Sequence, residues 1–109
     1  MLCQVAVPTA LIEQAAERFR LLSDPTRLRL LNALDHHSEL AVGELAELAH
    51  VGLSNTSKHL HQLEREGIVA KRRDGTTIYY RIADASVAEL CDIVCSGLRQ
   101  RFADLASNT

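Results

Sequence analysis

The residues best suited to chemistry in this chain are its three cysteines, Cys3, Cys91 and Cys95. Cys91 and Cys95 are four residues apart, so on a helix their thiols would lie on one face, with Cβ atoms about 6 Å apart. Two thiols at that separation can bind one soft metal ion together. Two alternatives stay open, namely redox chemistry through a disulfide or an inserted sulfur bridge, and simple packing as small apolar side chains.

A second group of polar side chains that could bind a ligand lies between residues 53 and 66, where apolar residues recur with helical spacing. Thr56, Leu60 and Leu63 form the predicted inner stripe of this helix. The opposite face contains no carboxylate and consists of Ser54, Asn55, Lys58, His61, Gln62 and Arg65. Amide, hydroxyl and basic side chains bind base edges and phosphates, so this face is a candidate DNA-binding surface. The alternative is an ordinary solvated helix face, although such a face usually mixes acids with bases.

The residues after this helix change to alternating spacing, which predicts two strands, 68–73 and 77–82, joined by a turn at 74–76. Arg72, Arg73 and Thr76 lie at the end of this hairpin. Cations at the tip of a hairpin can bind phosphates or enter a narrow minor groove. The alternative for the two arginines is a charged edge strand that prevents aggregation.

Helical spacing and capping signals predict four more helices, at about 9–22, 25–35, 42–49 and 84–105. Ser23-Asp24-Pro25 is the clearest start signal, because a capping side chain precedes a proline in the first turn. Leu45 and Leu48 are expected to face the core. Helices 42–49 and 53–66 are joined by only three or four residues, as in a helix-turn-helix. The prediction is a mainly α (α+β) winged helix-turn-helix of order ααααββα, with the helix-turn-helix at about 42–66 and the wing at about 67–82.

The composition limits the function classes. A chain of 109 residues that is 47% apolar and 24% charged fits one globular domain over 1–109. It contains no apolar run that could span a bilayer and no signal-peptide pattern, so we expect a cytoplasmic protein with no membrane contact. The net charge is −2, yet residues 58–81 hold six basic and three acidic side chains, which favours a nucleic-acid partner. No nucleophile–base pair or phosphate-binding glycine loop is present, so we expect no enzyme.

Three stretches of the chain resemble the ArsR/SmtB family of bacterial winged-helix repressors, and the likeness extends from about residue 15 to 98. They are LLSDPTRLRLL at 21–31, the helix-turn-helix at 45–63 with its core Ser57-Lys58-His59-Leu60, and the hairpin at 67–82. The resemblance adds Ser57 and His59 to the DNA-binding candidates. It implies binding to double-stranded DNA at an inverted-repeat operator, with helix 53–66 in the major groove.

The resemblance also implies a homodimer, built by the first and last helices at about 9–22 and 84–105. Both helices independently carry more apolar surface than a monomer of this size can easily cover. Repression would be relieved by a ligand that favours the dimer away from DNA. Two metal sites of the family are missing here, since residues 39–44 hold no cysteine and the last helix has Asp84 and Asp92 but no histidine.

The remaining thiols give the sensor hypothesis. Cys3 precedes the first helix, which is expected to pack on the partner's last helix, so Cys3, Cys91 and Cys95 can form a three-thiolate site. Such a site suits As(III), Sb(III), Cd(II) or Pb(II) better than Zn(II), which prefers a fourth ligand. We therefore predict a dimeric repressor released by a soft metal or metalloid ion. The alternatives are a redox- or persulfide-responsive repressor of the same fold, and a winged-helix interaction module that does not bind DNA.

Overall fold

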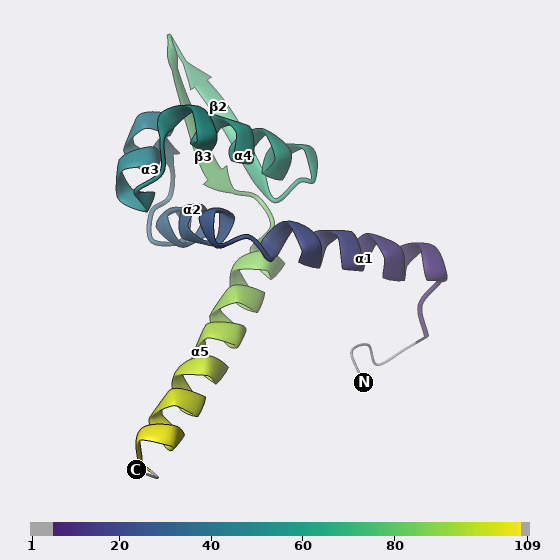
Figure 1. Ribbon diagram of the computed structural model, residues 1–109. Coiled ribbons are helices and arrows are strands. Elements are labelled where there is room, and N and C mark those ends of the chain that lie inside the picture. Colours follow the sequence, from purple (N-terminus) through teal and green to yellow (C-terminus); the bar gives the residue numbers. More distant parts are fainter. Residues whose placement is uncertain (1–5, 108–109) are drawn as a thin grey trace.

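The computed structural model describes residues 6–107, which form five helices and three strands (Figure 1). The helices are α1 (Thr9–Leu22), α2 (Pro25–Asp35), α3 (Val42–Ala49), α4 (Leu53–Arg65) and α5 (Ala85–Ser107). The strands are β1 (Leu40–Ala41), β2 (Val69–Asp74) and β3 (Thr77–Ile82). Every predicted helix is present, and its ends lie within two residues of the prediction.

The sheet contains one strand more than the predicted hairpin. β1 pairs antiparallel with β3, with Leu40 opposite Tyr80, and the strand order is β1-β3-β2. β1 has only two residues, so it shows no alternating pattern that the sequence analysis could detect. The predicted order ααααββα is therefore corrected to ααβααββα, while the winged helix-turn-helix itself is confirmed.

Local signals position the helix-turn-helix and the wing as predicted. The Asp24 side chain accepts hydrogen bonds from the backbone N–H groups of Thr26 and Arg27 and so caps α2. The wing turns through Gly75, whose φ of 64° glycine adopts readily because it has no Cβ atom. Because Asp74 pairs with Thr77, the loop of the hairpin is only two residues long.

The core lies where α2, α3 and α4 meet the sheet. The inner stripe of α4 is buried as predicted, since Thr56, Leu60 and Leu63 have no exposed surface. The prediction for α3 is only half right. Leu45 is fully buried, but Leu48 is 51% exposed because α3 packs through Leu45 and Ala49 and turns Leu48 outward.

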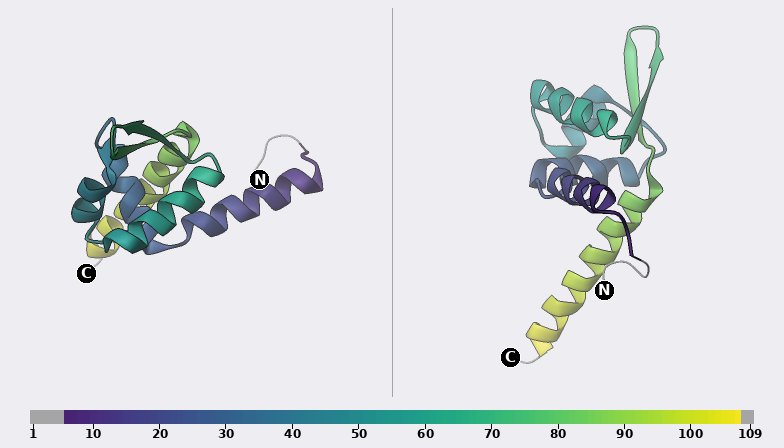
Figure 2. Two further views of the ribbon diagram at one scale, coloured as in Figure 1. Left: turned by 90° about the horizontal axis from the view of Figure 1, so that it is seen from above. Right: turned by 90° about the vertical axis from the view of Figure 1, so that its right-hand side faces the viewer.

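Helices α1 and α5 project from this core in different directions (Figures 1 and 2). The radius of gyration is 16.1 Å, compared with about 13 Å for a compact domain of this length. Both helices expose large apolar side chains, namely Leu11, Ile12, Phe19, Ile93, Val94, Leu98, Phe102 and Leu105. A single chain therefore leaves these apolar faces uncovered, in line with the sequence analysis. No helix within residues 6–107 has the length and apolar character needed to cross a membrane.

Candidate nucleic-acid interface

The polar face of α4 is open to solvent. Its exposed members are Ser54, Asn55, Lys58, His61, Gln62 and Arg65, and Ser57 at its edge is half-buried. Within residues 6–107, the side chains of Asn55, Lys58 and Arg65 make no hydrogen bond or ion pair. Their polar groups are therefore free to bind another molecule.

Two further members of the predicted set, His59 and Gln62, are bonded to α2 instead. The guanidinium of Arg27 donates from Nε to His59 Nδ1 at 3.1 Å and from Nη2 to Gln62 Oε1. His59 is half-buried as a result, while Gln62 stays exposed. In these two side chains, only the atoms that Arg27 leaves unoccupied are available to another molecule.

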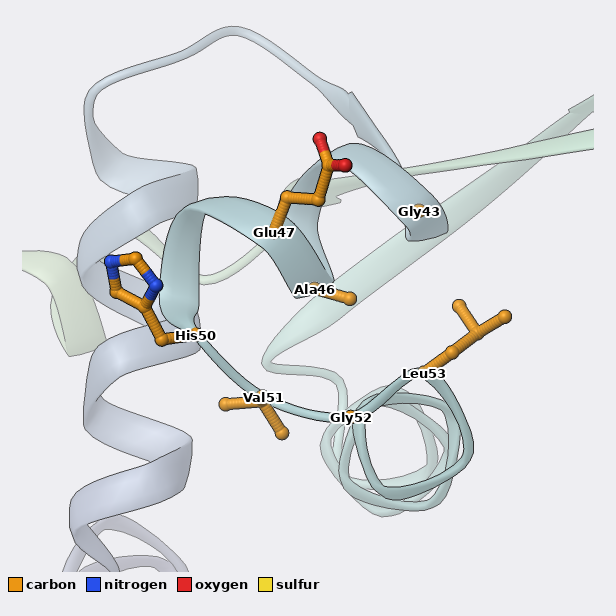
Figure 3. A pocket seen from close by; sticks show the side chains of 7 residues that line it. All are labelled: Gly43, Ala46, Glu47, His50, Val51, Gly52 and Leu53. Atoms are coloured by element: carbon orange, nitrogen blue, oxygen red, sulfur yellow. The ribbon is translucent and has the colours of Figure 1, made fainter.

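The turn between α3 and α4 borders an open groove at the start of α4 (Figure 3). Ala46, Val51 and Leu53 give its walls an apolar character, and Leu53 is 60% exposed. Glu47 is the one carboxylate among the lining residues, and no lysine or arginine is among them. This groove is therefore poorly suited to phosphate, and the cationic surface begins farther along α4.

In the wing, the two arginines have different surroundings. Arg72 binds Glu39 through Nη2 to Oε1 at 2.5 Å and Nε to Oε2 at 3.3 Å, and its guanidinium lies 4.7 Å from the centre of the Tyr79 ring. The hydrogen bond from Arg72 holds the pKa of Glu39 below its usual value. Arg73 and Thr76 are exposed near the end of the hairpin, and Arg73 has no ion pair in the described part of the chain.

The thiols Cys91 and Cys95 lie where α5 leaves the core. Cys91 is half-buried and packs against the core, whereas Cys95 is exposed, and from Asp92 to Ser107 every residue of α5 is exposed. Burial raises the pKa of the Cys91 thiol, and the neighbouring Cys95 and Asp92 raise it further. Cys3 lies outside the described residues. Within residues 6–107, no three His, Cys, Asp or Glu side chains are grouped so that they could hold a metal ion.

The residues that connect these elements were not among the candidates predicted from the sequence. Arg18 of α1 binds Asp84 Oδ2 at 2.6 Å and the backbone carbonyl of Glu66 at 2.7 Å, so it joins α1 to the end of α4 and the start of α5. Arg27 and Glu39 have similar long-range partners. None of these pairs has a local pattern in the sequence, because the two partners are between 32 and 66 residues apart in the chain.

Comparison with known proteins agrees with this architecture. The model of the family described as "Bacterial regulatory protein, arsR family" matches residues 24–71. The cadmium resistance transcriptional regulatory protein CadC of Listeria innocua is 35% identical over 75 residues, which are 69% of this chain and 63% of CadC. This chain therefore spans less than two thirds of the length of that curated relative.

Two solved structures extend the likeness to nearly the whole chain. The homodimeric winged helix-turn-helix DNA-binding domain of Mb0332 from Mycobacterium bovis has a TM-score of 0.78 and 33% identity, and the match covers 94% of each chain. The antimony-specific transcriptional repressor AntR has a TM-score of 0.83 and 27% identity, covering 92% of this chain and 90% of AntR. The named relatives are transcriptional regulators. The chain belongs to the ArsR family of bacterial transcriptional regulators.

Proposed function

We propose that this protein is a dimeric, DNA-binding transcriptional repressor that leaves its operator when its cysteine thiols bind a soft metal or metalloid ion. The observation that carries the proposal is the open face of α4, which is free of carboxylates and lies beside an exposed hairpin. Helix faces of this composition suit the major groove, and a basic hairpin suits the neighbouring backbone or minor groove.

The proposed DNA contacts divide by chemistry. Lys58, Arg65 and Arg73 are free cations for phosphates, and Asn55 has the amide that pairs with an adenine edge. Ser54, Ser57, His61 and Thr76 supply shorter polar contacts. His59, Gln62 and Arg72 remain candidates through the atoms that their internal bonds leave free.

The proposed dimer uses α1 and α5, whose apolar faces a single chain leaves open. The similar Mb0332 domain is homodimeric, which supports this assignment. A two-fold dimer places two recognition helices about 34 Å apart, or one turn of DNA, so the operator should be an inverted repeat. The cytoplasm is the expected location, because it keeps thiols reduced.

The proposed sensor consists of Cys91 and Cys95, with Cys3 as the third ligand. Both thiols lie at the boundary between the packed and the uncovered part of α5, where an ion could change how the partner packs. The relatives CadC and AntR are named for cadmium and antimony, which supports As(III), Sb(III), Cd(II) or Pb(II) as inducers. Because only a thiolate binds a metal ion, and the pKa of Cys91 is raised, ion binding should displace a proton from Cys91 and tighten as the pH increases.

The test is titration of a complex between the purified protein and duplex DNA from upstream of its own gene. Each of the four ions is added in turn, and release is followed by fluorescence anisotropy. Cys91→Ser and Cys95→Ser should bind DNA as the wild type does but resist release, whereas Ser96→Ala on the same helix should behave as the wild type.

Three outcomes would contradict parts of the proposal. Release of the Cys91→Ser/Cys95→Ser double variant by the same ion would place the sensor elsewhere. Release by a persulfide or an oxidant, with no response to any ion, would favour the redox alternative. A wild-type protein that ignores duplex DNA even at low salt would exclude the repressor and leave the interaction module.

A further inference from the structure

Arg27 lies in the first turn of α2, and its side chain contacts two other helices, α1 and α4. Its Nη1 donates to the backbone carbonyl of Leu21 in the last turn of α1 at 3.2 Å. Its other two hydrogen bonds reach His59 and Gln62 of α4. One guanidinium therefore joins the end of α1 to the middle of α4.

The geometry of these bonds restricts how α4 can turn. His59 and Gln62 are three residues apart, so they are neighbours along one side of the helix. A guanidinium is planar and rigid, and it holds both acceptors in fixed directions. Since Asn55, Lys58 and Arg65 extend from the same helix, the rotation that Arg27 fixes also fixes where these free side chains point.

We propose that Arg27 is a positioning residue for DNA recognition, which sets the rotation of α4 relative to α1 without touching DNA itself. This inference rests on the proposed function, because the surface that Arg27 orients is the proposed DNA-binding face. Arg27 also connects α1, a helix of the proposed dimer interface, directly to α4. Any shift of α1 against a partner would reach the recognition helix through the Leu21 carbonyl and this side chain.

The contact has a signature that does not depend on DNA. Because Arg27 donates to Nδ1 of His59, the neutral imidazole must carry its proton on Nε2. The ¹⁵N shifts of the His59 ring, measured by NMR at pH 8, should therefore show the Nε2–H form in the wild type. Arg27→Gln should move the ring toward a mixture of the two neutral forms.

The binding test uses Arg27→Gln and Arg27→Lys, with Arg29→Gln as the matched control. Arg29 is an exposed arginine on the same helix, and among the described residues its side chain bonds only Thr26. The probes are a duplex that the wild type selects from a random-sequence pool and a shuffled duplex of the same composition. Affinities are measured over a series of salt concentrations. The temperature is kept well below the thermal unfolding midpoint of each variant, so that partial unfolding does not contribute.

We expect Arg27→Gln to lose about tenfold in affinity for the selected duplex, which corresponds to about 1.4 kcal/mol. Arg27→Lys should lose less, because it keeps one donor and the charge. Affinity for the shuffled duplex and the salt dependence should not change, since positioning adds no phosphate contact. Arg29→Gln should match the wild type with both duplexes.

Several results would overturn the inference. A salt slope lower by about 0.9, with equal losses for both duplexes, would make Arg27 a phosphate contact. Unchanged affinity of folded Arg27→Gln for the selected duplex would show that its contacts are only structural. If the wild type binds DNA but its His59 carries the proton on Nδ1, the Arg27 contact is excluded and the proposed function stands. Failure to select any duplex, with His59 in the Nε2–H form, would instead exclude the proposed function and the positioning role with it.

Discussion

At the scale of single residues, the polar side chains of the proposed interface differ in how much they are already engaged. Lys58 and Arg73 have no internal partner in the described part of the chain, so they bring their full charge to a ligand. Arg72 is bound to Glu39, whose carboxylate offsets its charge, and its guanidinium lies over the Tyr79 ring. Similar residue types on one surface therefore have different roles.

Replacing Lys58 by alanine should remove one phosphate contact. The logarithm of DNA affinity against the logarithm of salt concentration should become less steep by about 0.9. Adding Asn55→Ala should reduce operator affinity further, by about tenfold, with little change in the unfolding midpoint because both side chains are exposed. Arg20→Ala, which removes a cation from α1, is the control and should leave the slope unchanged. Wild-type binding by the double variant would mean that another surface contacts DNA.

Glu39→Gln should strengthen binding to DNA of any sequence by a few fold at low salt. The carboxylate now neutralises Arg72 near the proposed DNA surface, and its loss would leave the arginine's charge available to phosphates. The gain should disappear as salt increases, because it is electrostatic. Glu13→Gln on α1 removes an equal charge from a distant site and should have no effect. A loss of affinity in Glu39→Gln would show that the ion pair is needed to hold Arg72 in place.

At the scale of elements, α1, α4 and α5 meet at Arg18 and Asp84. Asp84 caps α5 through hydrogen bonds from the Ser86 hydroxyl and backbone N–H, at 2.5 and 3.0 Å, and it accepts the ion pair from Arg18. The same guanidinium binds the Glu66 carbonyl at the end of α4. One carboxylate thus stabilises a helix start and the junction of two other helices.

Because of this junction, we expect the free energy of unfolding to decrease at acidic pH. The Ser86 hydroxyl, the backbone N–H groups of Ser86 and Val87, and Arg18 lower the pKa of Asp84 in the folded protein. A carboxylate with a lowered folded pKa stabilises the fold above its unfolded pKa of about 4, and this contribution is lost as the pH falls from about 5 downward. Asp84→Asn should cost about 0.5–1 kcal/mol at pH 7, since the pair is partly exposed, and should flatten the dependence of unfolding free energy on pH.

Urea unfolding at several pH values between 3 and 7 measures this effect. Asp104→Asn is the control, because Asp104 lies on α5 and, within residues 6–107, accepts a hydrogen bond only from Gln100. An Asp84→Asn protein with the same pH dependence as the wild type would show that other carboxylates dominate acid unfolding.

At the scale of the whole molecule, the uncovered apolar faces of α1 and α5 favour the proposed dimer. α5 buries only Val87 among its residues, and Leu98, Phe102 and Leu105 continue the same side of the helix into solvent. Large exposed apolar faces on two projecting helices are typical of an interface and not of a monomer surface. Cys91 and Cys95 lie between the packed and exposed parts of this side, which is why an ion there could affect assembly.

Phe102→Asp should therefore convert the dimer to a monomer, because it places a charge in the apolar interface. Light scattering after size exclusion measures the mass, and operator affinity should fall at the same time, since a monomer reads only one half-site. Ser96→Asp adds the same charge on the opposite side of α5 and should remain dimeric. A dimeric Phe102→Asp protein would show that the end of α5 lies outside the interface.

Much of the architecture could be read from local patterns. The Asp24-Pro25 cap, the stripe of Thr56, Leu60 and Leu63, and the turn at Gly75 depend on neighbours a few residues away, and the structure agrees with each. Leu48 was predicted wrongly because helical spacing defines two possible flanks of a short helix and does not say which one the core covers. β1 was missed because its pairing with β3 alone defines it.

The sequence by itself determined the five helices and the two strands of the hairpin, which α4 residues are buried, and that α4 has a polar face without acids. Periodicity and capping depend on residues close together in the chain, so they can be recognised without knowledge of the fold. Only the tertiary structure decided that Arg27 holds His59 and Gln62, that Glu39 holds Arg72, and that Cys91 lies at the edge of the core. These contacts join residues distant in the chain, and their partners are chosen by how the helices pack.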